Sequence, residues 1–65
     1  MDAKTIGNLV RKKRKELGLT QAYLAAVANT GVRFISDLEN GKPTVELEKT
    51  LNVLKVLNIN LEVKD

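Results

Sequence analysis

The sequence predicts an all-α domain of four helices that ends in one short β-strand. In four segments, apolar residues recur every three or four positions between residue types that begin or end helices. The last residues instead alternate between apolar and polar, which is typical of a strand. A chain of 65 residues allows one domain. We therefore expect residues 1–58 to form a helical domain and residues 59–65 to form a dimerisation strand.

Two helices are expected in the first half of the chain, over residues 3–17 and residues 21–28. Asp2 can cap the first of them, and Gly18 is the type of residue that ends a helix. Thr20 is a favourable N-cap for the second, because its hydroxyl can accept a hydrogen bond from the first helical turn.

The second helix is followed closely by a third, and the stretch "ANTGVRF" at residues 28–34 separates them. Asn29 can adopt the left-handed conformation that ends a helix. The third helix is expected over residues 32–40, with Gly41 closing it. Two short helices joined by about three residues make a helix-turn-helix unit. In such a unit the later helix projects as a rod that fits the major groove of DNA.

A fourth helix is expected over residues 45–57, after Pro43, which forbids continuation of the third. Thr44 can cap this helix. Four leucines at helical spacing predict its inward face, namely Leu47, Leu51, Leu54 and Leu57.

The tail after Asn58 has no partner strand elsewhere in the chain, and a lone strand leaves its backbone groups unpaired. Its natural partner is the same tail from a second copy, which gives an antiparallel pair across a two-fold axis. Valines on the side of the fourth helix away from its leucines add apolar surface. The residues predicted to form this homodimer are Val53, Val56, Ile59, Leu61 and Val63.

Composition limits the chemistry that the chain can perform. It has no cysteine and no histidine, which removes thiolate metal sites and the commonest general base. We expect no enzyme, no metal and no cofactor. The absence of a membrane-length apolar run and of a signal peptide pattern favours a cytoplasmic protein.

Charge is concentrated in the first part of the chain. Residues 1–42 hold 8 Lys and Arg against 4 acids, which gives +4, and residues 43–65 hold 3 against 4, which gives −1, for the total of +3. A basic N-terminal part indicates a polyanionic partner, although a solvated helix face would have the same composition.

The stretch "LGLTQAYLAAVANTGVRFISDLENGKP" resembles the Cro/C1-type (Xre) helix-turn-helix domain of phage repressors and bacterial regulators. More narrowly, "RFISDLENGKPTVELEKTLNVLKVLNINLEV" resembles the short HipB-type antitoxins. Asn29 stands where this family usually has glycine, and Gly31 where it often has a Ser or Thr cap. The resemblance implies a transcriptional repressor that binds double-stranded DNA at a near-palindromic operator. It also implies a HipA-type kinase toxin as partner. The alternatives are a stand-alone, phage-like repressor and a protein-binding module with the same fold.

By the same resemblance, the exposed face of the third helix reads base edges, through Val32, Arg33, Ser36 and Asp37. Arg33 can donate two hydrogen bonds to guanine, and Val32 can touch a thymine methyl group. Asp37 could accept from cytosine or could instead orient Arg33.

Three further residues are expected to contact DNA phosphates: Gln21, which resembles the family's phosphate-contacting glutamine, and Asn40 and Lys42. Gln21 lies at the start of the second helix, with the other two expected on the opposite flank. Arg14 and Glu39 match a pair that joins the first helix to the end of the third, so we expect a partly buried salt bridge between them. The rest of the basic run at residues 11–15 is expected to be mostly solvated surface.

Overall fold

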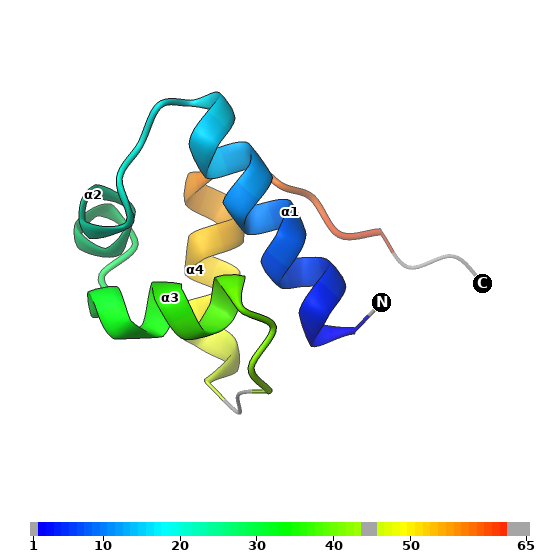
Figure 1. Cartoon of the computed structure of the whole chain (residues 1–65). Coiled ribbons are helices and arrows are strands. Elements are labelled where there is room, and N and C mark those ends of the chain that lie inside the picture. Colours follow the sequence, from blue (N-terminus) through cyan, green and yellow to red (C-terminus); the bar gives the residue numbers. More distant parts are fainter. Residues whose placement is uncertain (1, 44–45, 63–65) are drawn as a thin grey trace.

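The computed structural model describes residues 2–43 and 46–62, and its described residues form four helices (Figure 1). α1 and α2 both pack against α3, and α4 packs against α2. The expected all-α architecture is confirmed. The helices are α1 (Ala3–Glu16), α2 (Gln21–Val27), α3 (Val32–Glu39) and α4 (Leu47–Val56).

Two of the helices begin at the side-chain caps that the sequence predicts. The Asp2 carboxylate accepts a hydrogen bond from the Thr5 backbone N–H at 2.8 Å, and the Thr20 hydroxyl accepts one from the Tyr23 N–H at 3.0 Å. The N-cap of α3 is Gly31, which has no side chain to offer such a bond. Its start is therefore held by backbone bonds and packing alone. The expected cap at Thr44 lies outside the described residues.

All four helices end in the same backbone turn. A residue with positive φ follows each helix, and the N–H of the next residue bonds to a carbonyl five positions earlier, as in a Schellman motif. The left-handed residues are Gly18, Asn29, Gly41 and Asn58. The first three were predicted to end their helices, and Asn58 ends α4 in the same way. This last turn directs Ile59 back against the core.

The inward face of α4 differs from the predicted leucine stripe. Thr50, Val53, Leu54 and Leu57 are buried, whereas Leu47 and Leu51 are 66% and 47% exposed. Val53 lies three residues after Thr50 and four before Leu57, so it shares their face of the helix. Its predicted role in dimerisation is wrong, because its side chain is completely buried within one chain.

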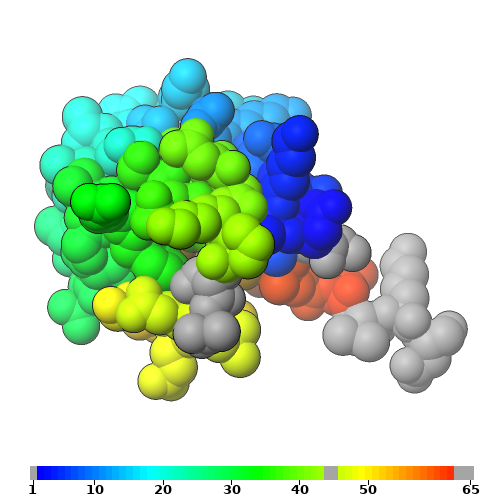
Figure 2. Space-filling view, turned by 60° about the horizontal axis from the view of Figure 1, so that its bottom comes forward, coloured from blue at the N-terminus to red at the C-terminus, as the bar shows by residue number. Residues whose placement is uncertain are grey.

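The tail contains no strand among its described residues, 59–62. Ile59 packs against the core together with Val56, and Leu61 is exposed. Val63 lies outside the described residues. Figures 1 and 2 both show residues 59–62 leaving the bundle beside the N-terminal half of α1. Among the described residues, no helix is long and apolar enough to span a membrane.

Gly7 allows α1 to approach the end of α3 closely. A Cβ atom at this position would lie 2.2 Å from the backbone oxygen of Leu38 and 3.0 Å from that of Glu39. Backbone atoms cannot rotate aside as a flexible side chain can. The two helices can therefore lie this close together only with glycine at this position.

We expect Gly7→Ala to destabilise the domain by about 1–3 kcal/mol, because the added methyl forces α1 away from α3. This occurs although alanine favours a helix over glycine by about 1 kcal/mol. Chemical denaturation measures the change. Asn8→Ala, at an exposed position of the same helix, is the control and should have little effect. A Gly7→Ala variant as stable as the natural chain would contradict the close packing.

Candidate nucleic-acid interface

One side of α3 faces solvent along its whole length. Its inward side chains, Ile35 and Leu38, belong to the buried core. The outward positions follow a helical stripe and are the exposed or half-buried residues Val32, Arg33, Ser36, Asp37 and Asn40. In Figure 2, α3 occupies the middle of one face, flanked by the start of α1. The residues predicted to read DNA bases therefore share one accessible surface.

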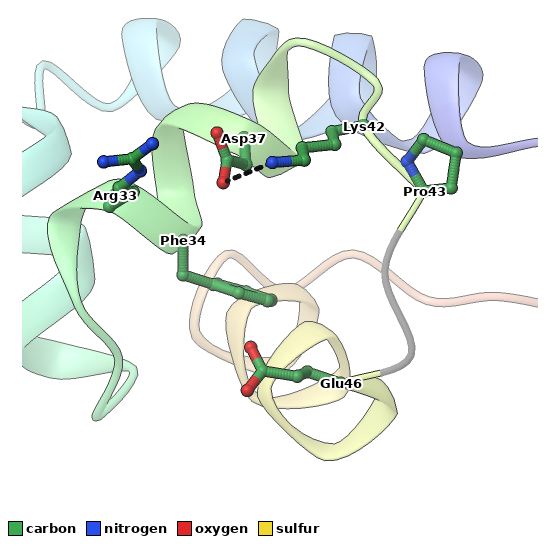
Figure 3. A pocket seen from close by; sticks show the side chains of 6 residues that line it. All are labelled: Arg33, Phe34, Asp37, Lys42, Pro43 and Glu46. Atoms are coloured by element: carbon green, nitrogen blue, oxygen red, sulfur yellow. Dashed lines mark ion pairs between the residues drawn. The ribbon is translucent and has the colours of Figure 1, made fainter.

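Arg33 is exposed and makes no hydrogen bond or ion pair with the residues that the structure describes. Figure 3 shows it beside the Asp37–Lys42 pair, with no ion pair drawn to either residue. A guanidinium carries five N–H donors in a fixed fork. All of them remain available to an external acceptor.

Asp37 pairs with Lys42 across the end of α3, with 3.7 Å between Oδ2 and Nζ. The alternative in which Asp37 orients Arg33 is not seen. Both side chains of the pair are exposed, and such surface pairs are weak. Lys42 can therefore leave Asp37 for a phosphate at little loss of stability.

A groove of about 370 Å³ runs between α3 and the start of α4 (Figure 3). Phe34 forms part of its wall and also packs against the core, with the Lys49 ammonium 5.9 Å from its ring centre. Phe34 is thus a packing residue. Charged side chains dominate the rest of the lining, which consists of Arg33, Asp37, Lys42, Pro43 and Glu46.

The contact expected between Arg14 and Glu39 is present. Arg14 Nε donates to one Glu39 carboxylate oxygen at 2.6 Å and Nη2 to the other at 3.0 Å. A third bond joins Arg14 Nη1 to the Leu19 carbonyl at 2.8 Å. The Glu39 side chain is fully buried and that of Arg14 is 11% exposed. This bidentate pair holds α1 and the α1–α2 turn against the end of α3.

Two more side chains donate to the same carboxylate. Gln21 Nε2 lies 3.1 Å from Glu39 Oε1, and Arg11 Nε lies 3.4 Å from it. Arg11 Nη2 also donates to the Asn40 Oδ1 at 2.8 Å. We call these residues the Glu39 cluster: Arg11, Arg14, Gln21, Glu39 and Asn40.

The cluster corrects one expectation about the site. Gln21 and Asn40 were expected on opposite flanks, but Glu39 and Arg11 join them into one network. Arg11 itself was assigned to the solvated surface. Its position three residues before Arg14 places both arginines on one side of α1, which is the signal that could have identified it.

Burial of Glu39 would by itself raise the pKa of its carboxyl group. The hydrogen bonds from Arg14 and Gln21, the positive charge of Arg14 and the bond from Arg11 together outweigh burial, so the pKa is lowered. The same pairing raises the pKa of the Arg14 guanidinium. Glu39 is thus an anion at neutral pH, and the cluster as a whole carries one net positive charge, because it contains two arginines and one carboxylate.

Comparison with known proteins places this arrangement in a family. The helix-turn-helix family model matches residues 10–64. An HTH-type transcriptional regulator of Sinorhizobium fredii, y4mF, is 52% identical over 58 residues, covering 89% of this chain and 76% of the relative.

A second relative is the ImmF control region 10 kDa protein of Bacillus phage phi105. It is 30% identical over 63 residues, which cover 97% of this chain and 70% of the relative. Both matches span the helix-turn-helix unit and the Glu39 cluster. The chain therefore belongs to the helix-turn-helix family of DNA-binding transcriptional regulators, and it is not an enzyme.

Proposed function

We propose that this protein is a repressor that recognises a specific sequence in double-stranded DNA by placing α3 in the major groove. The observation that carries this proposal is the exposed face of α3, on which Arg33 has no partner among the described residues. An unpaired, exposed guanidinium on a projecting helix suits bidentate hydrogen bonding to guanine O6 and N7.

The other outward side chains of α3 extend the reading surface. Val32, half exposed at the start of the helix, supplies an apolar contact for a thymine methyl group. Ser36 can bond a base or a phosphate. Asp37 contributes mainly through Lys42, because a carboxylate already paired with an ammonium is a weaker acceptor for a cytosine amino group.

Contacts to the DNA backbone set the position of α3 in the groove. We assign them to Gln21, Asn40 and Lys42, which lie at or beside the C-terminal end of α3. Phosphate contacts fix register without reading sequence, and cationic ones release counterions.

Selection from a random duplex library, followed by fluorescence anisotropy on the selected site, tests the proposal. We expect tighter binding to the selected duplex than to a scrambled duplex of equal length, and affinity that falls as salt rises. Equal binding to both duplexes would leave only non-specific attraction. No binding to either at low salt would favour a protein-binding module.

We further propose that the repressor acts as a homodimer, with α4 and the tail at the interface. Leu47, Leu51 and Leu61 are large apolar side chains exposed on this side. Leu51 and Leu61 also line a hollow of about 280 Å³ between α4 and the tail. A second copy's tail would cover this surface, and pairing of the two tails would satisfy their backbone groups. Two copies of α3 would then lie roughly 34–36 Å apart on a near-palindromic site.

Leu51→Asp should convert the dimer to a monomer in sedimentation experiments and weaken operator binding, because a charge replaces a side chain that the partner covers. Asn52→Asp, at the exposed neighbouring position, adds the same charge and should leave the dimer intact. Truncation after Asn58 is a less specific test, since it also removes Ile59 from the core. A tight dimer in the Leu51→Asp variant would place the interface elsewhere.

The resemblance to HipB-type antitoxins supports a narrower role, in which the dimer holds a HipA-type kinase toxin while bound to its own operator. This role rests on the sequence pattern of residues 33–63, and neither relative's name mentions a toxin. Co-purification with a kinase encoded beside this gene is the test. Failure to associate would remove the antitoxin role and leave DNA recognition untouched.

A further inference from the structure

Arg11 differs from the lysines that surround it on α1. Its guanidinium bridges two acceptors, with Nε 3.4 Å from Glu39 Oε1 and Nη2 2.8 Å from Asn40 Oδ1. Lys12, Lys13 and Lys15 make no ion pair with the described part of the chain. Arg11 is therefore the one member of the basic run, apart from the structural Arg14, that forms an ion pair within the described part of the chain.

This position fixes the orientation of the Asn40 amide. An asparagine amide has an accepting oxygen at one end and a donating NH2 group at the other. Arginine can only donate, so it must meet the oxygen, and the NH2 group is left on the opposite side. Asn40 is exposed, so this group is accessible from solution. A phosphate offers only acceptor oxygens to a neutral amide, and the NH2 group is the end that it needs.

The charge of Arg11 is already engaged by Glu39, whose buried carboxylate also holds Arg14. Arg14 is in turn fixed by the Leu19 carbonyl. Arg11 is thus held by a fully buried carboxylate that a second arginine also binds. A contact held in its bound orientation before binding loses less conformational entropy when the ligand arrives.

We propose that Arg11 is a positioning residue for DNA backbone recognition, which holds the Asn40 amide with its NH2 group directed at a phosphate. The inference rests on the proposed DNA-binding function and extends it to a residue that itself needs no contact with DNA. Two properties distinguish this role from a direct phosphate contact. The affinity lost on removing Arg11 should depend on the presence of Asn40. Removing Arg11 should also leave unchanged the number of counterions released when DNA binds.

The first experiment uses the protein without DNA. Side-chain NMR relaxation should show a rigid Asn40 NH2 group in the natural chain and a mobile one in Arg11→Met, which keeps the aliphatic stem and removes every donor. Lys12→Met removes the same charge from the same helix and should leave Asn40 rigid. An equally rigid Asn40 amide in Arg11→Met would overturn the proposal whether or not the protein binds DNA.

The second experiment measures affinity for the selected duplex at several salt concentrations, with circular dichroism showing that each variant is folded at the assay temperature. Arg11→Met should bind about threefold to tenfold more weakly, with the slope of log K against log salt unchanged. Asn40→Ala should lose a similar factor, and the double variant Arg11→Met/Asn40→Ala should lose little more than Asn40→Ala alone.

Two results would contradict the proposal. A salt slope lowered by about 0.9 for each copy bound in Arg11→Met would mean that Arg11 contacts a phosphate itself. Losses that multiply in the double variant would mean that Arg11 and Asn40 act independently. Absence of DNA binding by the natural chain would instead refute the proposed function, and the NMR result would still decide whether Arg11 holds the Asn40 amide.

Discussion

Glu39→Ala should lower the free energy of unfolding by about 3–5 kcal/mol, because removal of one partner of a buried pair leaves the other charge uncompensated. Arg14, whose side chain is 11% exposed in the natural chain, would be left with only the Leu19 carbonyl as an acceptor. A domain of 65 residues has a total stability of roughly 3–10 kcal/mol. The variant should therefore be largely unfolded or close to it, as measured by urea denaturation followed by circular dichroism.

Two controls separate the buried pair from general effects of charge. Glu48→Ala removes an exposed carboxylate from α4 and should change stability by less than about 0.5 kcal/mol. Glu39→Gln keeps size and one accepting oxygen, so its loss should lie between those of the two alanine variants. A loss of less than about 1 kcal/mol in Glu39→Ala would show that the Glu39 cluster does not hold the fold together.

The lowered pKa of Glu39 also predicts how stability depends on pH. Its folded pKa lies below that of the unfolded chain, so its stabilising effect is complete above the unfolded value and is lost as pH falls through the folded one. Unfolding should become easier below about pH 4.5, and Glu39→Gln should remove much of this dependence. Asp2, whose pKa is lowered by hydrogen bonds from Thr5, accounts for part of the remainder. An identical acid transition in the natural chain and Glu39→Gln would contradict this assignment.

Most of the fold could be predicted because the residues that end its helices act through their own local conformation. Gly18, Asn29 and Gly41 end their helices through their own tolerance of positive φ, which depends little on tertiary structure. The face that α4 buries could not be predicted as well. Leucine and valine are both apolar, so the pattern fits two overlapping stripes, and only packing against the rest of the bundle selects the one that contains Val53.

The candidate site also has one part that the sequence predicts and one part that it does not. The outward stripe of α3 follows directly from helical periodicity once Ile35 and Leu38 are placed inward. The pairing of Asp37 with Lys42 and the bridge from Arg11 to Asn40 depend on where the turn after α3 brings its side chains. The sequence shows that Lys42 lies near this turn and that Arg11 lies in a basic run. Their individual partners follow only from the folded backbone.

Arg33→Ala should weaken binding to the selected site by about 1–3 kcal/mol for each half-site, because the variant loses a bidentate contact with one base pair in each of them. Binding to a scrambled duplex should fall much less. Arg33 is exposed and has no partner in the described chain, so the variant should fold as stably as the natural protein. Fluorescence anisotropy on both duplexes measures the two affinities.

Lys42→Ala is the matched comparison, since it also removes one exposed cation from the same surface. We expect it to weaken binding to the selected and scrambled duplexes alike and to reduce the salt slope by about 0.9 for each copy bound. A uniform loss of this kind in Arg33→Ala would mean that Arg33 contacts the DNA backbone and does not read a base.

The base preferences of the natural protein and of Arg33→Ala, selected side by side from one random duplex library, test the reading role of α3 most directly. The natural protein should select a near-palindromic sequence with a strongly preferred guanine in each half-site. Arg33→Ala should lose that preference at the same base pair and keep the others. An unchanged set of preferences in the variant would contradict the placement of α3 as the reading helix.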